Sequence, residues 1–163
     1  NDKKTLAYAS HESEPHLYFL FRGDYTHSTT PTLSKPQGAG FTCVFDNNTP
    51  MLFITHGTGI TALRGAMVER KIHNLLKKDT LLYGSPSKDS EPSLDCLSAN
   101  FGINQLRAYS QDPKNLHIQD VLQTLDVKNF ESILLIGSGS MTKTCKEILI
   151  TKNFPIEKIY TNF

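Results

Sequence analysis

The sequence predicts an α/β fold in which a parallel sheet carries helices on both faces. Two observations indicate it. From Met51 onward, short apolar runs alternate with longer amphipathic segments, which is the pattern of parallel β-α-β units. Glycine, serine and threonine follow several of these runs, so small residues would gather at the carboxyl edge of the sheet, where such folds bind ligands. We therefore expect one α/β domain over residues 50–163.

Each element of this domain is identified from its own pattern. Apolar runs bounded by turn residues are typical of buried strands, whereas apolar residues three or four apart indicate helices. Residues 61–76, for example, place Leu63, Ala66, Met67 and Ile72 on one side of a helix. The expected strands cover residues 51–55, 80–84, 105–110, 132–138 and 156–163, and the expected helices cover residues 61–76, 92–100, 118–125 and 141–151. Five parallel strands joined by right-handed crossovers follow from this order.

The first part of the chain has a different character. Residues 1–49 are expected to form a partial β segment, because aromatic and apolar runs at residues 6–10, 16–22 and 41–45 suit strands. A long stretch rich in proline, glycine, serine and threonine, residues 23–40, is expected to be a loop. This segment is too small to form an independent barrel.

Composition excludes several classes of function. The net charge of +1 gives no basic stripe for nucleic acid or a membrane surface, and no apolar run approaches the roughly 20 residues that span a bilayer. No secretory signal is recognisable, so a cytoplasmic location is expected. The three cysteines, Cys43, Cys96 and Cys145, lie far apart without a C-x-x-C pair, so a zinc site is not expected.

The first loop after a strand, Gly57-Thr58-Gly59, leads directly into a helix. Glycines there would leave the backbone N–H groups at the helix start open to a phosphate, and the hydroxyls of Thr58 and Thr61 could bond the phosphate or cap the helix. The same glycines also fit an ordinary tight turn. The spacing is neither that of the G-x-G-x-x-G fingerprint nor that of a Walker loop. His56, just before the loop, is the histidine expected to contact a ligand, or otherwise to cap the strand.

The order of the loop motifs is more specific than any single loop. "GTGITALRGAMVER", "LLYGS", "RAYSQDPKNLHIQDVL", "LLIGSGSMTKTCKEIL" and a terminal aromatic follow one another. Over residues 41–163 this order resembles the nicotinamide-binding half of the ferredoxin–NADP reductase family, with the diflavin reductases and sulfite-reductase flavoproteins closest. Upstream, "KTLAYAS" resembles an eroded flavin-binding motif, so residues 1–49 would be the remnant of a flavin-binding barrel, most of which is missing.

The resemblance implies NADPH or NADH as one cofactor and FAD as a second. Thr58 and Phe163 would be catalytic, with the glycine loop facing nicotinamide and pyrophosphate and Phe163 stacking on the flavin. Alternatively, Phe163 plugs the edge of the sheet. The implied cofactor-binding residues are Lys4, Ser10, Gly57, Thr58, Gly59, Ser85, Ser110, Gln111, Lys114, Gln119, Gly137, Ser138, Met141 and Phe163.

The chain also departs from the family pattern. Two arginines of that pattern are replaced by Pro86 and Gln111, and glutamine cannot make the two-pronged, charge-assisted phosphate contact of arginine. Discrimination in favour of NADPH should therefore be weak. The thiol of the family's Cys-Gly pair is absent, because Ile136 precedes Gly137.

Two functions are consistent with these observations. The first is an NAD(P)H-dependent flavin oxidoreductase domain that passes electrons to a flavodoxin-like or ferredoxin-like partner or domain. The second is a degenerate, non-catalytic domain that binds a nucleotide or another protein. The intact glycine loop and terminal aromatic favour the first, and the lost arginines and the eroded flavin motif favour the second. A fragment of a larger reductase would also explain the missing barrel.

Overall fold

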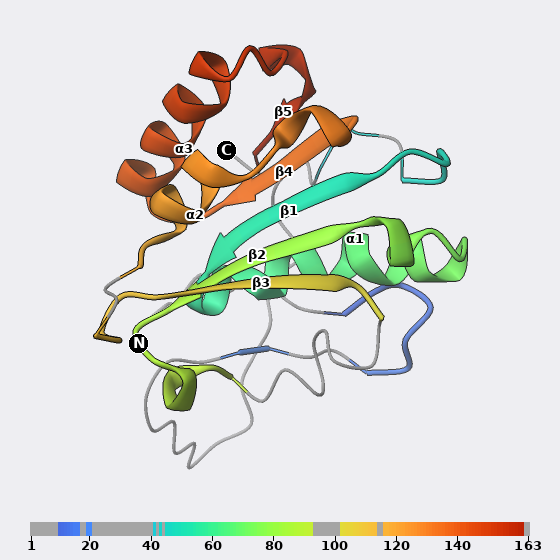
Figure 1. Cartoon of the computed structure of the whole chain (residues 1–163). Coiled ribbons are helices and arrows are strands. Elements are labelled where there is room, and N and C mark those ends of the chain that lie inside the picture. The colour runs from blue at the N-terminus through green and yellow to red at the C-terminus, as the bar shows by residue number, and fades with distance from the viewer. Residues whose placement is uncertain are drawn as a thin grey trace.

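The computed structural model describes residues 10–16, 19–20, 41, 43, 45–92, 102–113 and 116–161. Within them lies a five-stranded, entirely parallel sheet with the strand order β3-β2-β1-β4-β5 (Figure 1). Its strands are β1 (Met51–His56), β2 (Thr80–Ser85), β3 (Asn104–Tyr109), β4 (Ser132–Ile136) and β5 (Ile159–Tyr160). The predicted α/β class and the five-stranded parallel sheet are thereby confirmed.

Helices cover both faces of this sheet. Helix α1 (Ile60–Ile72) packs on one face, while α2 (Ile118–Thr124) and α3 (Gly139–Thr151) pack together on the other (Figure 1). Strand β1 is central, and its side chains alternate between the two cores: Met51 and Phe53 face α1, whereas Leu52 and Ile54 face α2 and α3. All four are fully buried, which explains the continuous apolar run in the sequence.

Several element ends differ from the prediction for local reasons. Helix α1 ends at Ile72 rather than at residue 76, because Asn74 turns the chain with a left-handed φ of 57°. A separate 3-10 turn then begins at Leu76, and the Leu76 side chain is buried in the core on the α1 face of the sheet. Strand β4 ends at Ile136 because Ser138 already caps α3. The last strand is short because residues 156–158 form a 3-10 turn, η7. The helix expected at residues 92–100 falls almost entirely outside the described residues.

The strand expected at residues 41–45 is not found where that run is described. Phe41, Cys43 and Phe45 adopt irregular and bent backbone instead. Their side chains pack, partly buried, against the core on the α1 face, and the rings of Phe41 and Phe45 meet edge to face at 6.5 Å. The apolar pattern of this run therefore reflects packing onto the α/β core. The other strands expected before residue 41 lie mainly outside the described residues.

A buried ion pair holds the segment that precedes β1 against the core. Arg70 of α1 has no exposed surface and donates to both carboxylate oxygens of Asp79, at 2.8 and 2.7 Å. Its remaining N–H groups reach the carbonyls of Asn47 and Thr49, each at 2.6 Å, and Asp79 accepts the backbone N–H of Met51 at 2.8 Å. Removing one partner of such a pair typically costs about 3–5 kcal/mol, because the other charge stays buried.

Candidate functional site

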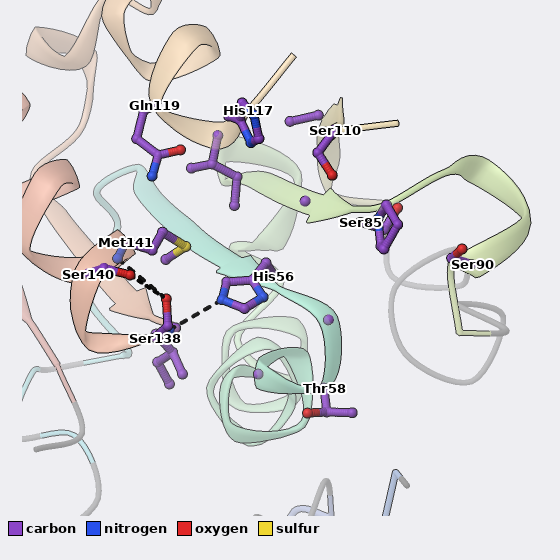
Figure 2. Close-up of a pocket in the computed structure, with 18 of the residues that line it drawn as sticks. His56, Thr58, Ser85, Ser90, Ser110, His117, Gln119, Ser138, Ser140 and Met141 are labelled. Carbon is purple, nitrogen blue, oxygen red and sulfur yellow. Dashed lines mark hydrogen bonds between the residues drawn. The ribbon is translucent and has the colours of Figure 1, made fainter. Parts of the chain in front are cut away.

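The described residues enclose a cleft of about 1000 Å³ along the carboxyl ends of β1, β2, β3 and β4 (Figure 2). Parallel strands end on the same side, and the register brings His56, Gly84 and Ala108 level with one another. The sequence-predicted residues that line the cleft are His56, Gly57, Thr58, Gly59, Ser85, Ser110, Gln119, Gly137, Ser138 and Met141. Residues from four separate loops are thus brought together.

The glycine strap, residues Gly57–Gly59, is a 3-10 turn between β1 and α1. Gly57 has φ +52°, a conformation that other residues adopt only with strain, and it faces open space. Gly59 is needed for a different reason: a Cβ there would lie 2.4 Å from the hydroxyl oxygen of Thr55. The strap is therefore a tight turn held close to the sheet, and it also lines the cleft.

The threonine of the strap and the threonine in the first turn of α1 have separate roles. Thr58 is exposed at the cleft, whereas Thr61 is 2% exposed and donates its hydroxyl to the Thr58 carbonyl at 2.8 Å. Thr61 therefore stabilises the start of α1 and does not cap an N–H group. Only Thr58 presents a hydroxyl to a ligand from this turn.

The opposite wall is formed where β4 enters α3. A Cβ on Gly137 would lie 2.3 Å from the Cε of Met141 and 3.1 Å from the Cδ2 of His56, so both side chains close over this glycine. Ser138 caps the helix, accepting the Met141 N–H at 3.4 Å (Figure 2). The backbone N–H of Ser138 donates to Nε2 of His56 at 3.2 Å. That nitrogen is therefore unprotonated, and a neutral His56 carries its proton on Nδ1.

The third side of the cleft comes from the loops after β2 and β3. Ser85 is buried and donates to the carbonyl of Ser87 at 2.8 Å. The bare Gly84 lets the Ile118 side chain approach, since a Cβ would lie 2.7 Å from it. His117 begins α2 through a reciprocal capping contact with Asp120, whose carboxylate accepts the His117 N–H at 2.8 Å.

Some predicted residues lie elsewhere. Ser10 is buried against α1, where its carbonyl lies 3.8 Å from the position of a Cβ on Gly65, and it does not line the cleft. Gln111 is exposed, is not among the lining residues, and bonds the Pro86 carbonyl through its backbone N–H at 2.7 Å. The positions of Lys4, Lys114 and Phe163 lie outside the described residues, so their roles stay predictions.

Several lining residues were not predicted. His117, Ser90, Ser140 and Thr144 contribute to the cleft, and Ser140 and Thr144 are four residues apart, a spacing that places both hydroxyls on one face of α3. That spacing was the signal available in the sequence. None of the described lining residues is Lys, Arg, Asp or Glu. Recognition by these residues would therefore use hydroxyls, imidazoles, the Gln119 amide and backbone N–H groups.

Within the described part of the chain, no helix is long and apolar enough to cross a membrane. Among the same residues, no group of three or more His, Cys, Asp or Glu side chains is arranged to hold a metal ion.

No protein-family model matches the sequence, and no curated protein sequence matches it. Solved structures do match its fold. A flavohemoglobin from Malassezia yamatoensis with bound FAD and heme aligns with a TM-score of 0.60 and 19% identity, over 70% of this chain and 31% of that one. A ferredoxin NADP+ reductase from Neisseria gonorrhoeae with bound FAD and NADP aligns with a TM-score of 0.58 and 13% identity, over 72% and 56% of the two chains.

A third similar structure is the H286L mutant of ferredoxin-NADP+ reductase from Plasmodium falciparum. It has a TM-score of 0.58 and 20% identity, over 71% of this chain and 52% of that one. The chain thus spans about a third to just over half of the length of these three proteins. It has the α/β fold of the NAD(P)-binding domain found in ferredoxin reductases.

Proposed function

We propose that this chain is the nicotinamide-nucleotide-binding part of an NAD(P)H-dependent flavin oxidoreductase. The observation that carries the proposal is the convergence of the glycine strap and the Gly137-Ser138 loop on one cleft at the carboxyl edge of the sheet. Solved structures of the same fold include proteins with bound FAD and NADP, which supports this class of ligand. The order of the loop motifs supports the diflavin or sulfite-reductase type within it.

The chain's own residues would bind and orient the nucleotide. The start of α1 behind the strap offers backbone N–H groups and partial positive charge for the pyrophosphate. Gly137, Ser138 and Met141 would border the nicotinamide, and Ser110 and Gln119 would contact the adenosine end. FAD, when bound beside this domain, would accept the hydride of the nicotinamide and pass electrons to a flavodoxin-like or ferredoxin-like partner.

The described residues fit the nucleotide better than they fit the flavin. The strap and the α3 loop form an open cleft with small residues, which suits a pyrophosphate and a flat ring. Among the residues predicted for FAD, Ser10 is buried against α1, and Lys4 and Phe163 lie outside the described residues. No catalytic step is therefore assigned to these three.

Absorbance spectroscopy tests the proposal directly. The purified chain would be mixed with FAD and then with NADH or NADPH, and the uptake of flavin and the bleaching of its visible absorbance would be recorded. We expect uptake followed by bleaching with either nucleotide. A protein that takes up no flavin and gives no bleaching would contradict the reductase function.

Two glycine variants of the α3 loop provide a matched comparison in a nucleotide titration. In Gly137→Ala the new methyl group would displace Met141 and His56, which both line the cleft, so nucleotide affinity should fall. In Gly139→Ala the new methyl group meets no atom within 4 Å, so affinity should stay close to that of the parent protein. Equal affinities for both variants would contradict the placement of the nucleotide.

A non-catalytic nucleotide-binding domain is the second candidate. One observation favours it: neither position where the family pattern has an arginine carries one here, and Gln111 does not line the cleft. This candidate predicts that NAD+ or NADP+ raises the melting temperature while flavin is neither taken up nor reduced.

A further inference from the structure

We propose that Tyr83 is a positioning residue for the nicotinamide nucleotide, because it holds the Gly57 carbonyl and so sets the shape of the glycine strap. The inference rests on the proposed function and deepens it. Tyr83 belongs to β2, not to the strap, and it does not itself line the cleft. Its effect on a ligand would therefore be transmitted through Gly57.

The hydrogen bond joins the buried side chain of Tyr83 to the backbone of Gly57, a residue with unusual conformational freedom. The hydroxyl of Tyr83 donates to the Gly57 carbonyl at 3.1 Å, and the Tyr83 side chain is fully buried in the core on the α1 face. Gly57 is left-handed, and the position of a Cβ on it has no atom within 4 Å. Side-chain packing therefore does little to hold this residue, and hydrogen bonds to its carbonyl decide where the peptide points.

The same carbonyl closes the strap. The backbone N–H of Ile60, the first residue of α1, bonds the carbonyls of Gly57 and Thr58. Tyr83 thus anchors the acceptor on which the turn into α1 depends. Displacement of the Gly57 peptide would shift the N–H groups that the proposed function directs at the pyrophosphate.

The Tyr83 hydroxyl remains a hydrogen-bond donor over the whole physiological pH range. Burial, and next the charge of Glu91, raise the pKa of Tyr83 to about 12, so the hydroxyl keeps its proton. The Arg107 guanidinium lies 5.5 Å from the ring centroid, at a distance typical of cation–π contacts. Its Nε lies 3.0 Å from a carboxylate oxygen of Glu91. The Tyr83 ring therefore contacts a charged pair as well as the apolar core.

The row Gly57–Tyr83–Arg107–Glu91 connects two walls of the cleft. Glu91 lies between Ser90 and Pro92, and both of these residues line the cleft after β2. The strap forms the other wall, at the end of β1. A continuous row of contacts through buried or half-buried side chains therefore links the two walls, and Tyr83 is the member that contacts the strap.

Tyr83→Phe tests the role, because it removes the hydroxyl and keeps the ring. One lost hydrogen bond should raise the Kd for NADH and for NADPH by the same factor, roughly 3- to 10-fold. The Kd for adenosine should stay unchanged, since adenosine carries neither the nicotinamide half nor the phosphates that the strap and the start of α1 would face. Isothermal titration with NADH, NADPH and adenosine measures all three. A merely structural loss would weaken adenosine binding as well.

Tyr160→Phe is the matched control. Tyr160 is half-buried on β5, at the edge of the sheet, and does not line the cleft. Loss of its hydroxyl should leave all three affinities as they are. Unchanged NADH affinity in Tyr83→Phe, a parallel loss for adenosine, or an equal effect of Tyr160→Phe would each overturn the inference.

Hydrogen exchange separates this inference from the proposed function. If the parent chain bound neither dinucleotide, the proposed function would fall. Exchange of the Ile60 amide would still decide whether Tyr83 holds the strap, because Tyr83→Phe should speed that exchange roughly 10-fold relative to core amides of β1, as local opening becomes easier. An unchanged Ile60 rate would show that Tyr83 does not hold the strap, and it would overturn the positioning role regardless of what the chain binds.

Discussion

Gly59 shows how one residue can be required for reasons that its motif does not reveal. The sequence suggests that both strap glycines make room for a ligand. In the structure, the space a Gly59 side chain would need is occupied by the Thr55 hydroxyl, 2.4 Å from the Cβ position. Ile136 on the neighbouring strand is also close, at 3.4 Å. Gly59 therefore lets the strap lie against β1 and β4.

Gly59→Ala should consequently destabilise the protein. Overpacking of this kind typically costs about 1–3 kcal/mol, because the buried Thr55 cannot move freely. Gly65→Ala is the matched control within α1: its Cβ would meet only the Ser10 carbonyl at 3.8 Å, an ordinary contact. That change should stabilise the helix by about 0.5–1 kcal/mol. Urea unfolding of both variants measures the difference, and equal midpoints would contradict the packing argument.

At the scale of elements, residues 10–16 are fastened onto α1 by charged side chains. Glu14 accepts from both terminal nitrogens of Arg64, one of them at 2.6 Å, and also takes the backbone N–H of His11 at 2.7 Å. His11 and His73 each contact Glu69, at 2.7 and 3.1 Å. Segment and helix are distant in sequence, so this attachment could not be predicted from either one alone.

The attachment predicts a dependence of stability on pH. The hydrogen bond from Arg64 is the largest influence on Glu14, and it lowers the carboxyl pKa below its ordinary value of 4.5. The stabilisation is therefore complete above that value and is lost as the pH falls through the lower, folded-state pKa. Glu14→Gln should flatten the loss of unfolding free energy between about pH 5 and pH 2.

Glu12→Gln is the control for this measurement, because Glu12 is exposed on the same segment. This substitution should leave the loss of unfolding free energy at acid pH unchanged. Urea unfolding at a series of pH values measures the free energy for each protein. Identical curves for Glu14→Gln and the parent would show that the pair with Arg64 does not contribute.

The helices and strands themselves were largely predictable. Strands β1, β2 and β4 each contain three or four consecutive apolar residues because parallel strands are covered on both faces, and the sequence shows this directly. Element ends were less predictable. The end of α1 depends on the left-handed Asn74, and the bent run at residues 41–45 depends on a core that only the folded chain provides.

At the scale of the whole molecule, the cleft is assembled from loops that lie far apart in the chain. The strand order places β1 between β2 and β4. Only this order brings together the strap, the loops after β2 and β3 and the start of α3. Its described lining carries neither acidic residues nor Lys or Arg. A nucleotide with an added 2′-phosphate therefore gains no fixed cation from these residues.

Thermal shift measurements with NAD+ and NADP+ test this consequence. A ligand that binds only the folded state stabilises it in proportion to the logarithm of its concentration over Kd. We expect the two nucleotides to raise the melting temperature by similar amounts, because the positions of Pro86 and Gln111 supply no arginine. A much larger shift with NADP+ would contradict weak discrimination and would indicate a cation contributed by another residue.

The sequence by itself determined the fold class, the order of the elements and most of the loop residues of the cleft. These features follow from local patterns: apolar runs, helical spacing, and small residues at strand ends. Only the tertiary structure decided that the Thr55 hydroxyl leaves no room for a side chain at Gly59. It also decided that Gln111 lies outside the cleft and that Tyr83 bonds the strap. Each of these depends on contacts between strands whose register is set by the complete sheet, and no local pattern records such contacts.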